Sequence, residues 1–293
     1  MEDLHNPVIF ISPGRSGSTI ISEMILAHKE LGGPSNYTEW FPNISGMAYL
    51  SRLSNNDYWY LEGVKGQLIK TLPFNNLIPR PAEAWSFWQT VTRSDIDFSR
   101  DFLLYKRAAE TERKQVHQVL SKMLAKQGKA RLGIKLTGPG RVEFLHSLFP
   151  DAHFINIVRE PSATVNSLLN MPFWQQQGAK KLWWKGAYSD SELETYQSIR
   201  HDPIASTAFQ LNKVLRTTRE EIERLNLNAL TVNYEDFIAN PIYTTRQILS
   251  FCHLSNDSRI DRKLKHCHAI NRNAQKLQNP EIKGIVEQWC PNS

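Results

Sequence analysis

The sequence predicts an α/β fold of three layers, in which helices cover both faces of a central parallel sheet. Short apolar runs that suit buried strands alternate along the chain with longer segments whose apolar residues recur at helical spacing. No internal repeat, low-complexity tract or linker interrupts this alternation. We therefore expect one domain over residues 1–293, a length that can bury a substantial core.

The expected strands are runs rich in Val, Ile, Leu and Phe that end at glycine, proline or a charged residue. They cover residues 8–11, 131–135, 153–158 and 229–234. The helices between them are expected to reach from residue 20 to about residue 28, then over 108–127, 142–149, from Pro161 onward, 205–225 and 242–251. A proline suits the first turn of a helix, which favours the start at Pro161.

One segment, about 45–128, departs from the simple alternation. Its periodicity is poor before the helix at 108–127, and aromatic residues are dense at 58–60 and at Trp85, Phe87 and Trp88. We interpret the segment as a helical insertion whose aromatic residues mostly build a core. The remainder are expected to form part of an acceptor pocket, since ligand sites are largely apolar and aromatic.

Composition excludes several classes of protein. The net charge is +6, yet no run of five basic residues occurs, which excludes a basic tail of the kind that binds nucleic acid. The sequence contains no stretch of eighteen apolar residues, which a membrane-spanning helix would need. The first residues lack the apolar core of a signal peptide. Cys252, Cys267 and Cys290 show no C-x-x-C spacing, which is typical of reduced thiols. The sequence thus predicts a cytoplasmic protein, with a zinc site at these cysteines and nearby histidines as the disfavoured alternative.

The loop SPGRSGST, residues 12–19, follows the first expected strand and precedes a helix. Backbone N–H groups at a helix N-terminus, together with the helix dipole, make such a loop an anion site. Laid over the Walker A pattern, the loop has the right length but carries Ser18 at the position of the essential lysine. Its own cation is Arg15. We interpret it as a P-loop-like phosphate-binding loop.

Further chemistry-bearing residues stand at the ends of the other strands: Lys135, Arg159 and Tyr234. Ligands of parallel sheets bind at the carboxyl ends of the strands, so these residues should meet the loop. Ser167 lies eight residues after Arg159, about two turns into the next helix, where it can share a phosphate with the arginine. A Walker B magnesium site needs an aspartate where Arg159 stands. Ser18 in place of the Walker A lysine and Arg159 in place of the Walker B aspartate both disfavour a kinase or nucleotide hydrolase.

These motifs resemble those of sulfotransferases that use 3′-phosphoadenosine 5′-phosphosulfate (PAPS). SPGRSGST resembles the family's 5′-phosphosulfate loop, FINIVREPSATVNSLL its 3′-phosphate motif, and VNYEDFIANP its YED segment. The resemblance covers residues 8–40, 131–171 and 230–252 and is weak over 49–105 and the tail.

The resemblance implies a role for each matching residue. Arg15, Ser16, Gly17, Ser18 and Thr19 would hold the 5′-phosphosulfate. Arg159 and Ser167 would bind the 3′-phosphate, and Tyr234 would lie against the adenine or its sugar. Lys135 would lie near the bridging oxygen, and with Arg15 it would be catalytic.

The expected catalytic base follows from one position at which this chain differs from the cytosolic members of the family. Cytosolic small-molecule members carry a histidine two residues after the lysine, whereas this chain has Thr137. It is therefore more similar to bacterial and Golgi-type members, in which a glutamate downstream of the loop is the base. Glu39, 24 residues after Arg15, is the matching candidate.

The resemblance thus implies in-line transfer of a sulfuryl group from PAPS to a hydroxyl or amine, with 3′-phosphoadenosine 5′-phosphate (PAP) as the product and no metal required. The acceptor would be a small molecule, a glycan or a lipid, and no nucleic-acid partner is expected. The alternatives are a P-loop nucleotide kinase or hydrolase and a non-catalytic nucleotide- or RNA-binding protein. The sequence indicates neither the acceptor nor the oligomeric state.

Overall fold

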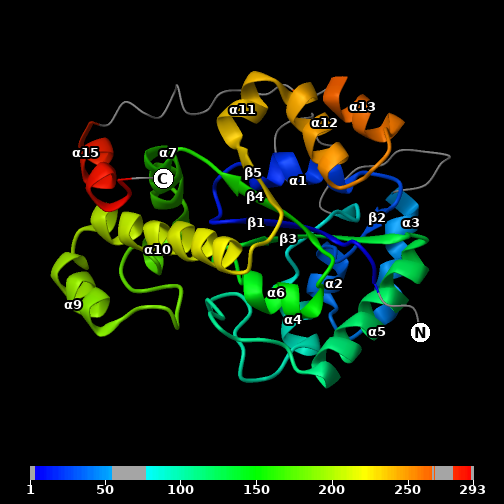
Figure 1. The fold of residues 1–293 in the computed structure, drawn as a ribbon, viewed down its shortest axis with the longest axis horizontal. Coiled ribbons are helices and arrows are strands. Elements are labelled where there is room, and N and C mark those ends of the chain that lie inside the picture. Colours follow the sequence, from blue (N-terminus) through cyan, green and yellow to red (C-terminus); the bar gives the residue numbers. More distant parts are fainter. Residues whose placement is uncertain (1–3, 55–76, 266, 268–279, 292–293) are drawn as a thin grey trace.

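The computed structural model describes residues 4–54, 77–265, 267 and 280–291. Over these residues an all-parallel sheet of five strands forms the centre, in the order β2-β3-β1-β4-β5. Helices lie on both of its faces, which confirms the predicted three-layer α/β fold (Figure 1). The strands are β1 (Val8–Ser12), β2 (Leu31–Gly32), β3 (Arg131–Thr137), β4 (His153–Val158) and β5 (Ala229–Asn233).

The three central strands end side by side. β1 pairs with β3, with Ser12 opposite Thr137, and on its other side with β4, with Ile11 opposite Asn156. β5 extends the sheet beyond β4. Because parallel strands present their carboxyl ends at one edge, the loops that follow β1, β3, β4 and β5 are gathered there.

Alternate residues of β1 face two different hydrophobic cores. Ile9 and Ile11 belong to the core that also contains residues of α4, α5 and α6. Val8 and Phe10 belong to the core on the opposite face, with residues of α1, α11, α12 and α13. A period of two along a strand produces this division.

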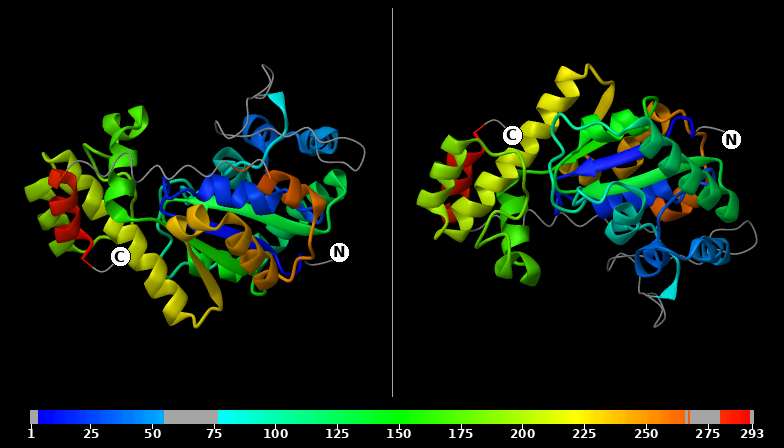
Figure 2. Two further views of the ribbon diagram at one scale, coloured as in Figure 1. Left: turned by 90° about the horizontal axis from the view of Figure 1, so that it is seen from above. Right: turned by 90° about the horizontal axis from the view of Figure 1, so that it is seen from below.

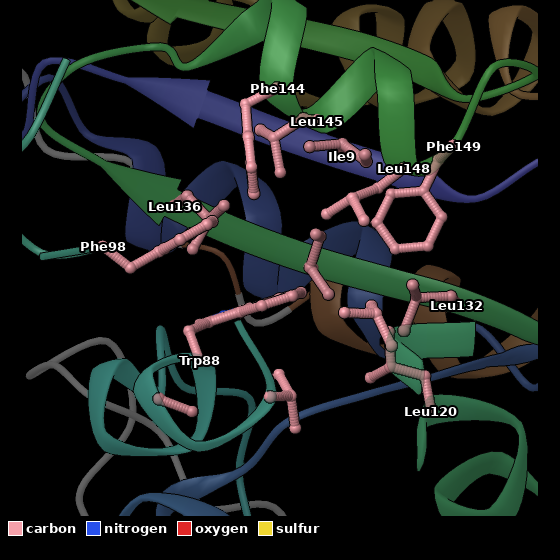
Figure 3. Packing of buried hydrophobic residues seen from close by; sticks show 14 of the residues in the cluster. Ile9, Trp88, Phe98, Leu120, Leu132, Leu136, Phe144, Leu145, Leu148 and Phe149 are labelled. Carbon is pink, nitrogen blue, oxygen red and sulfur yellow. The ribbon is translucent and has the colours of Figure 1, made fainter. Parts of the chain in front are cut away.

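Trp88 lies at the centre of the first core. It is fully buried and stacks on Phe98, with ring centroids 5.1 Å apart. Figure 3 shows Trp88 beside β3, with side chains of α6 such as Phe144 and Leu145 around the same strands. These contacts attach the aromatic-rich segment firmly to the sheet.

The helices around the sheet fall into three groups. The first face carries α4 (Trp85–Val91), α5 (Glu110–Gln127) and α6 (Val142–Leu148). The second carries α1 (Ser18–Leu26), α11 (Tyr234–Ala239), α12 (Pro241–Phe251) and α13 (Ser258–Lys265). Beyond the carboxyl ends of the strands lie α7 (Pro161–Leu169), α8 (Pro172–Gln176), α9 (Asp190–Ile199) and α15 (Pro280–Trp289), at the left of both views in Figure 2. The long helix α10 (Pro203–Arg224) runs from this group back to α6.

The remaining described elements are short and precede α4: α2 (Asn36–Trp40), the 3₁₀ helix η1 (Ser45–Leu50) and α3 (Ser51–Ser54). Within the expected insertion the described helices are η1, α3, α4 and α5, and the stretches 79–84 and 92–109 between them are irregular. The aromatic residues 58–60 lie outside the described residues. Across the described ranges, the structure contains no helix that combines the length and the apolar character needed to cross a bilayer.

Element boundaries differ little from those predicted, with one strand added. β2 occupies Leu31–Gly32, inside a segment whose glycines and proline indicate only the end of a helix. Its pairing with the start of β3 creates this two-residue strand. At the other edge, the strand expected over 229–234 ends at Asn233, because Tyr234 already begins α11.

A buried carboxylate joins α10 to the start of α6. The two carboxylate oxygens of Glu221 accept the backbone N–H groups of Val142 and Glu143, at 3.1 and 3.2 Å. Burial raises the pKa of Glu221 to about 7, although these two hydrogen bonds act in the opposite direction. The group is therefore partly protonated near neutral pH in the folded protein.

The free energy of unfolding should depend on pH through Glu221. Its pKa is about 7 in the folded chain and 4.5 as an ordinary carboxyl, so the folded state binds more protons between these values. The resulting stabilisation is fully present below the lower pKa and is lost as the pH rises through the higher one. Relative to Glu221→Gln, the wild type should lose on the order of 2–3 kcal/mol across this window. Urea titrations of both proteins at about pH 4.5 and pH 8 measure the change, and a constant difference would contradict it.

Candidate functional site

The loop after β1 forms a cradle against the start of α1. Gly14 and Gly17 have φ angles of +84° and +77°, a region that glycine adopts at little cost, and Arg15 between them has φ +58°. Gly17 is the N-cap of α1, so the N–H groups of the first turn of α1 face the loop. The hydroxyl of Ser16 is buried and has no hydrogen-bond partner among the described residues. A buried hydroxyl of this kind can be satisfied by a bound anion or by an ordered water.

Two arginines and a serine meet over this loop. The Nε of Arg15 donates to the Oγ of Ser167 in α7 at 3.1 Å. The Nη1 of Arg159, at the end of β4, donates to the carbonyl oxygen of Arg15 at 3.0 Å. The loop after β1 and the element after β4 are thus hydrogen-bonded to each other around cationic groups.

Tyr234 closes the other side of the loop. The guanidinium of Arg159 lies over its ring, 4.8 Å from the centroid. A Cβ atom built on Gly17 would lie 2.1 Å from the Cδ2 of Tyr234, so only glycine fits at that position. Burial lowers the pKa of Arg159, and the Tyr234 and Glu235 groups partly oppose this shift. The guanidinium remains charged at neutral pH.

Lys135 lies on the opposite side of the loop, toward β3. Its Nζ donates to the Oγ1 of Thr19 at 3.3 Å and lies 3.1 Å from the Oε1 of Glu83. The Lys135 side chain is 9% exposed and that of Glu83 is 18% exposed. The second oxygen of Glu83 accepts a hydrogen bond from the Oγ1 of Thr137 at 2.9 Å.

Glu83 is a site residue that the sequence does not reveal. It precedes α4 in a segment without clear periodicity, 52 positions before Lys135. Only the packing of α4 against the first core brings its carboxylate to the end of β3.

Glu39, the predicted base, lies in α2 beside the start of α4. Its two carboxylate oxygens accept from Ser86, one from the backbone N–H at 3.0 Å and one from the hydroxyl at 2.9 Å. Ser86 belongs to the first turn of α4. Glu39 therefore caps α4, and these hydrogen bonds connect it to that helix rather than to the loop after β1.

A cavity of about 850 Å³ adjoins the site over one face of β4 and β5, where it is lined by Asn156, Val158, Thr231 and Asn233. Pro13 and Arg159 border it on the loop side, and α10 forms its opposite wall. In the part of the chain that the structure describes, no cluster of three or more His, Cys, Asp or Glu side chains is arranged to hold a metal ion.

Comparisons with known proteins agree with this arrangement. A family model described as "Sulfotransferase family" matches residues 7–258. Two curated relatives, the omega-hydroxy-beta-dihydromenaquinone-9 sulfotransferases Stf3 of Mycobacterium bovis and Mycobacterium tuberculosis, are 22% identical to the chain over 260 residues. This match covers 80% of the chain and 59% of each relative, so the chain spans well under two thirds of their length.

Solved structures share the fold. Sulfotransferase STF9 from Mycobacterium avium superposes with a TM-score of 0.60 at 15% identity, covering 99% of this chain and 77% of that one. The sulfotransferase domain from the curacin biosynthetic pathway superposes with a TM-score of 0.52 at 15% identity, covering 98% of both chains. At such low identity these likenesses concern the fold alone.

Proposed function

Because this chain belongs to the sulfotransferase family, we propose that it transfers a sulfuryl group from PAPS to a hydroxyl or amine of an acceptor. The observation that carries the proposal is the hydrogen-bonded contact of Arg15 with Ser167 and Arg159 around the loop after β1. A sulfuryl group carries less negative charge than a terminal phosphate. A loop with Ser18 in place of the Walker lysine, and a strand ending in Arg159 in place of the Walker B aspartate, suit such a donor.

The residues present fit the cofactor at both of its charged ends. Residues 15–19 would hold the 5′-phosphosulfate, and the buried hydroxyl of Ser16 supports an anion at this place. Arg159 and Ser167 would bind the 3′-phosphate, and the ring of Tyr234 would lie against the adenosine. When bound, the cofactor supplies the sulfuryl group and a phosphate leaving group.

The cations of the site would act on the charge that develops at the leaving oxygen. Lys135 lies within hydrogen-bond distance of Thr19 in the first turn of α1, so its ammonium group can reach the same anion as the loop. Arg15 approaches from the other side. Preorganised donors of this kind stabilise developing negative charge without further reorganisation. A carboxylate would take the proton of the acceptor, and the sequence predicts Glu39 for that part.

We further propose a hydroxylated lipid as the acceptor. The curated relatives at 22% identity are named for a lipid with a terminal hydroxyl. Two tryptophans lie on segments next to the carboxyl end of β3: a Cβ on Gly138, just after β3, would lie 2.8 Å from the indole nitrogen of Trp184, and Trp85 begins α4 two residues after Glu83. Aromatic and apolar side chains at this edge of the sheet would suit the apolar body of such an acceptor.

Nucleotide preference tests the proposal without knowledge of the acceptor. PAP at about 100 times its Kd should stabilise the wild type by about 2.7 kcal/mol and raise the melting temperature by about 5 °C or more. ATP with Mg²⁺ should have little effect. Arg159→Ala should abolish most of the PAP-induced shift, whereas Arg113→Ala, a change on the surface of α5, should preserve it. Stabilisation by ATP–Mg²⁺ and not by PAP would favour the kinase alternative.

A further inference from the structure

The carboxylate of Glu83 lies between two groups at the carboxyl end of β3. We propose that Glu83, rather than Glu39, is the catalytic base that accepts the proton of the attacking acceptor, and that Glu39 is a positioning residue. The inference rests on the proposed sulfuryl transfer and names the residue that would carry its proton-transfer step.

Distance is the first support. The Oε1 of Glu83 lies 3.1 Å from the Nζ of Lys135, and that nitrogen in turn lies 3.3 Å from the Oγ1 of Thr19 in the first turn of α1. Only the side chain of Lys135 therefore connects Glu83 to Thr19, in the loop that would hold the sulfuryl group. A base must lie within hydrogen-bond reach of the attacking group, and an acceptor placed against the loop beside Lys135 would be near the Oε1 of Glu83.

Orientation is the second support. The hydroxyl of Thr137 donates to the Oε2 of Glu83 at 2.9 Å. The backbone of Thr137 is itself held, because the fully buried Arg141 donates to its carbonyl oxygen at 3.3 Å and to that of Pro139 at 2.7 Å. One oxygen of Glu83 is thus fixed by a rigid donor, and the other faces the lysine.

The backbone around Glu83 is also fixed, at an energetic cost. Ala84 has φ +55°, a left-handed conformation that disfavours an L residue by roughly 1–2 kcal/mol. The carbonyl oxygen of Glu83 accepts from the indole nitrogen of Trp88 at 3.0 Å, and the N–H of Ala82 donates to the carbonyl of Pro34 at 3.1 Å. Strained backbone held in place by its surroundings is concentrated at functional sites.

Glu39 lacks these features but supports them. Both of its oxygens accept from Ser86, so the carboxylate is oriented by the first turn of α4 and not by β3. Ser86 follows Glu83 by three residues, and the two acidic residues therefore act on the same stretch of chain. By fixing the start of α4, Glu39 would hold Glu83 in place without contacting the acceptor.

In the proposed step, the proton of the acceptor would move to Glu83 as the sulfuryl group moves to the acceptor oxygen. Lys135 leaves its ion pair with Glu83 to neutralise the leaving phosphate oxygen, which frees the Oε1 of Glu83. The proton of the acceptor hydroxyl moves to that oxygen while the hydroxyl oxygen bonds to sulfur. The bond from sulfur to the bridging oxygen breaks, and its electron pair stays on the 5′-phosphate. Thr137 keeps donating to the second carboxylate oxygen throughout.

Binding of PAP gives a readout that does not depend on turnover. In Glu83→Gln the ion-pair partner of Lys135 is removed, so the lysine is available to the ligand and PAP should bind as tightly as to the wild type or a few-fold more tightly. Isothermal titration calorimetry measures this, with Glu110→Gln, an exposed carboxylate at the start of α5, as the matched control. A ten-fold weaker affinity for PAP in Glu83→Gln would overturn the role assigned to Glu83.

Turnover is measured as transfer of ³⁵S from labelled PAPS into a total lipid extract. Glu83→Gln should lose about 10²-fold or more in rate, whereas Glu39→Gln should lose less than about ten-fold and show a lower melting temperature, as expected from a lost helix cap.

Added formate should restore part of the activity of Glu83→Ala but not of Glu39→Ala. Glu83→Asp, which keeps the carboxylate, should retain more activity than Glu83→Gln and guards against a variant that fails to fold.

The outcomes separate this inference from the proposed function. A wild type that binds PAP and labels lipid, together with a fully active Glu83→Gln, would overturn the inference and leave the proposed function standing. A loss confined to Glu39→Gln, with PAP binding intact, would return the base to Glu39. A wild type that neither binds PAP nor transfers the label would refute the proposed function itself.

Discussion

Replacing Lys135 by Met should lower the rate of sulfuryl transfer by about 10²–10³, the usual cost of removing one group that stabilises transition-state charge. Methionine keeps the apolar stem of a side chain that is only 9% exposed, so the core around β3 should remain packed. The effect should appear in kcat, because Lys135 is expected to act on charge that develops during the reaction. Steady-state kinetics of ³⁵S transfer into lipid extract measure it.

The matched control is Lys114→Met, since Lys114 is 71% exposed on α5 and distant in sequence from the loop residues. It should retain the rate of the wild type. An unchanged kcat in Lys135→Met, at an unchanged melting temperature, would exclude Lys135 from the chemical step.

Replacing Gly17 by Ala should destabilise the loop after β1 and abolish binding of PAP. The new Cβ would lie 2.1 Å from the Cδ2 and 2.5 Å from the Cε2 of the Tyr234 ring, and φ at this position is +77°. Overpacking and a left-handed non-glycine residue together should cost about 2–4 kcal/mol in the free energy of unfolding. Chemical denaturation and calorimetry with PAP measure the two effects.

Two further variants identify the cause. Gly46→Ala introduces the same methyl group where nothing lies within 4 Å, and it should be nearly neutral. Combining Gly17→Ala with Tyr234→Ala should cost less than the sum of the two single changes, because the clash needs both partners. Strict additivity would show that Tyr234 does not lie on the loop as described.

The sequence predicts site residues best where the residues of one motif stand close together in the chain. The loop over residues 12–19, the strand ending at Arg159 and the serine eight residues later form contiguous motifs, and the structure brings Arg15, Arg159 and Ser167 into hydrogen-bonded contact. The parallel sheet followed from the alternation of apolar runs and helical patterns. Its carboxyl edge then fixed where the motifs must meet.

Long-range contacts explain what the sequence could not provide. Glu83 stands 54 positions before Thr137, and nothing in its irregular surroundings indicates that a buried Trp88 will turn it toward β3. The distance to the loop along the chain favours Glu39 as the base, whereas its hydrogen-bond partner Ser86 lies 47 positions away. The two residues of β2 are likewise a strand only because β3 passes beside them.

Direct observation of group transfer tests the central claim. The purified protein, incubated with ³⁵S-labelled PAPS and a total lipid extract without added metal, should move the label into a lipid product and release one PAP per label transferred. Arg159→Ala should slow this transfer strongly at low PAPS concentration. No labelled product from lipid, metabolite or glycan extracts, together with no binding of PAP, would contradict the assignment of this chain as a PAPS-dependent sulfotransferase.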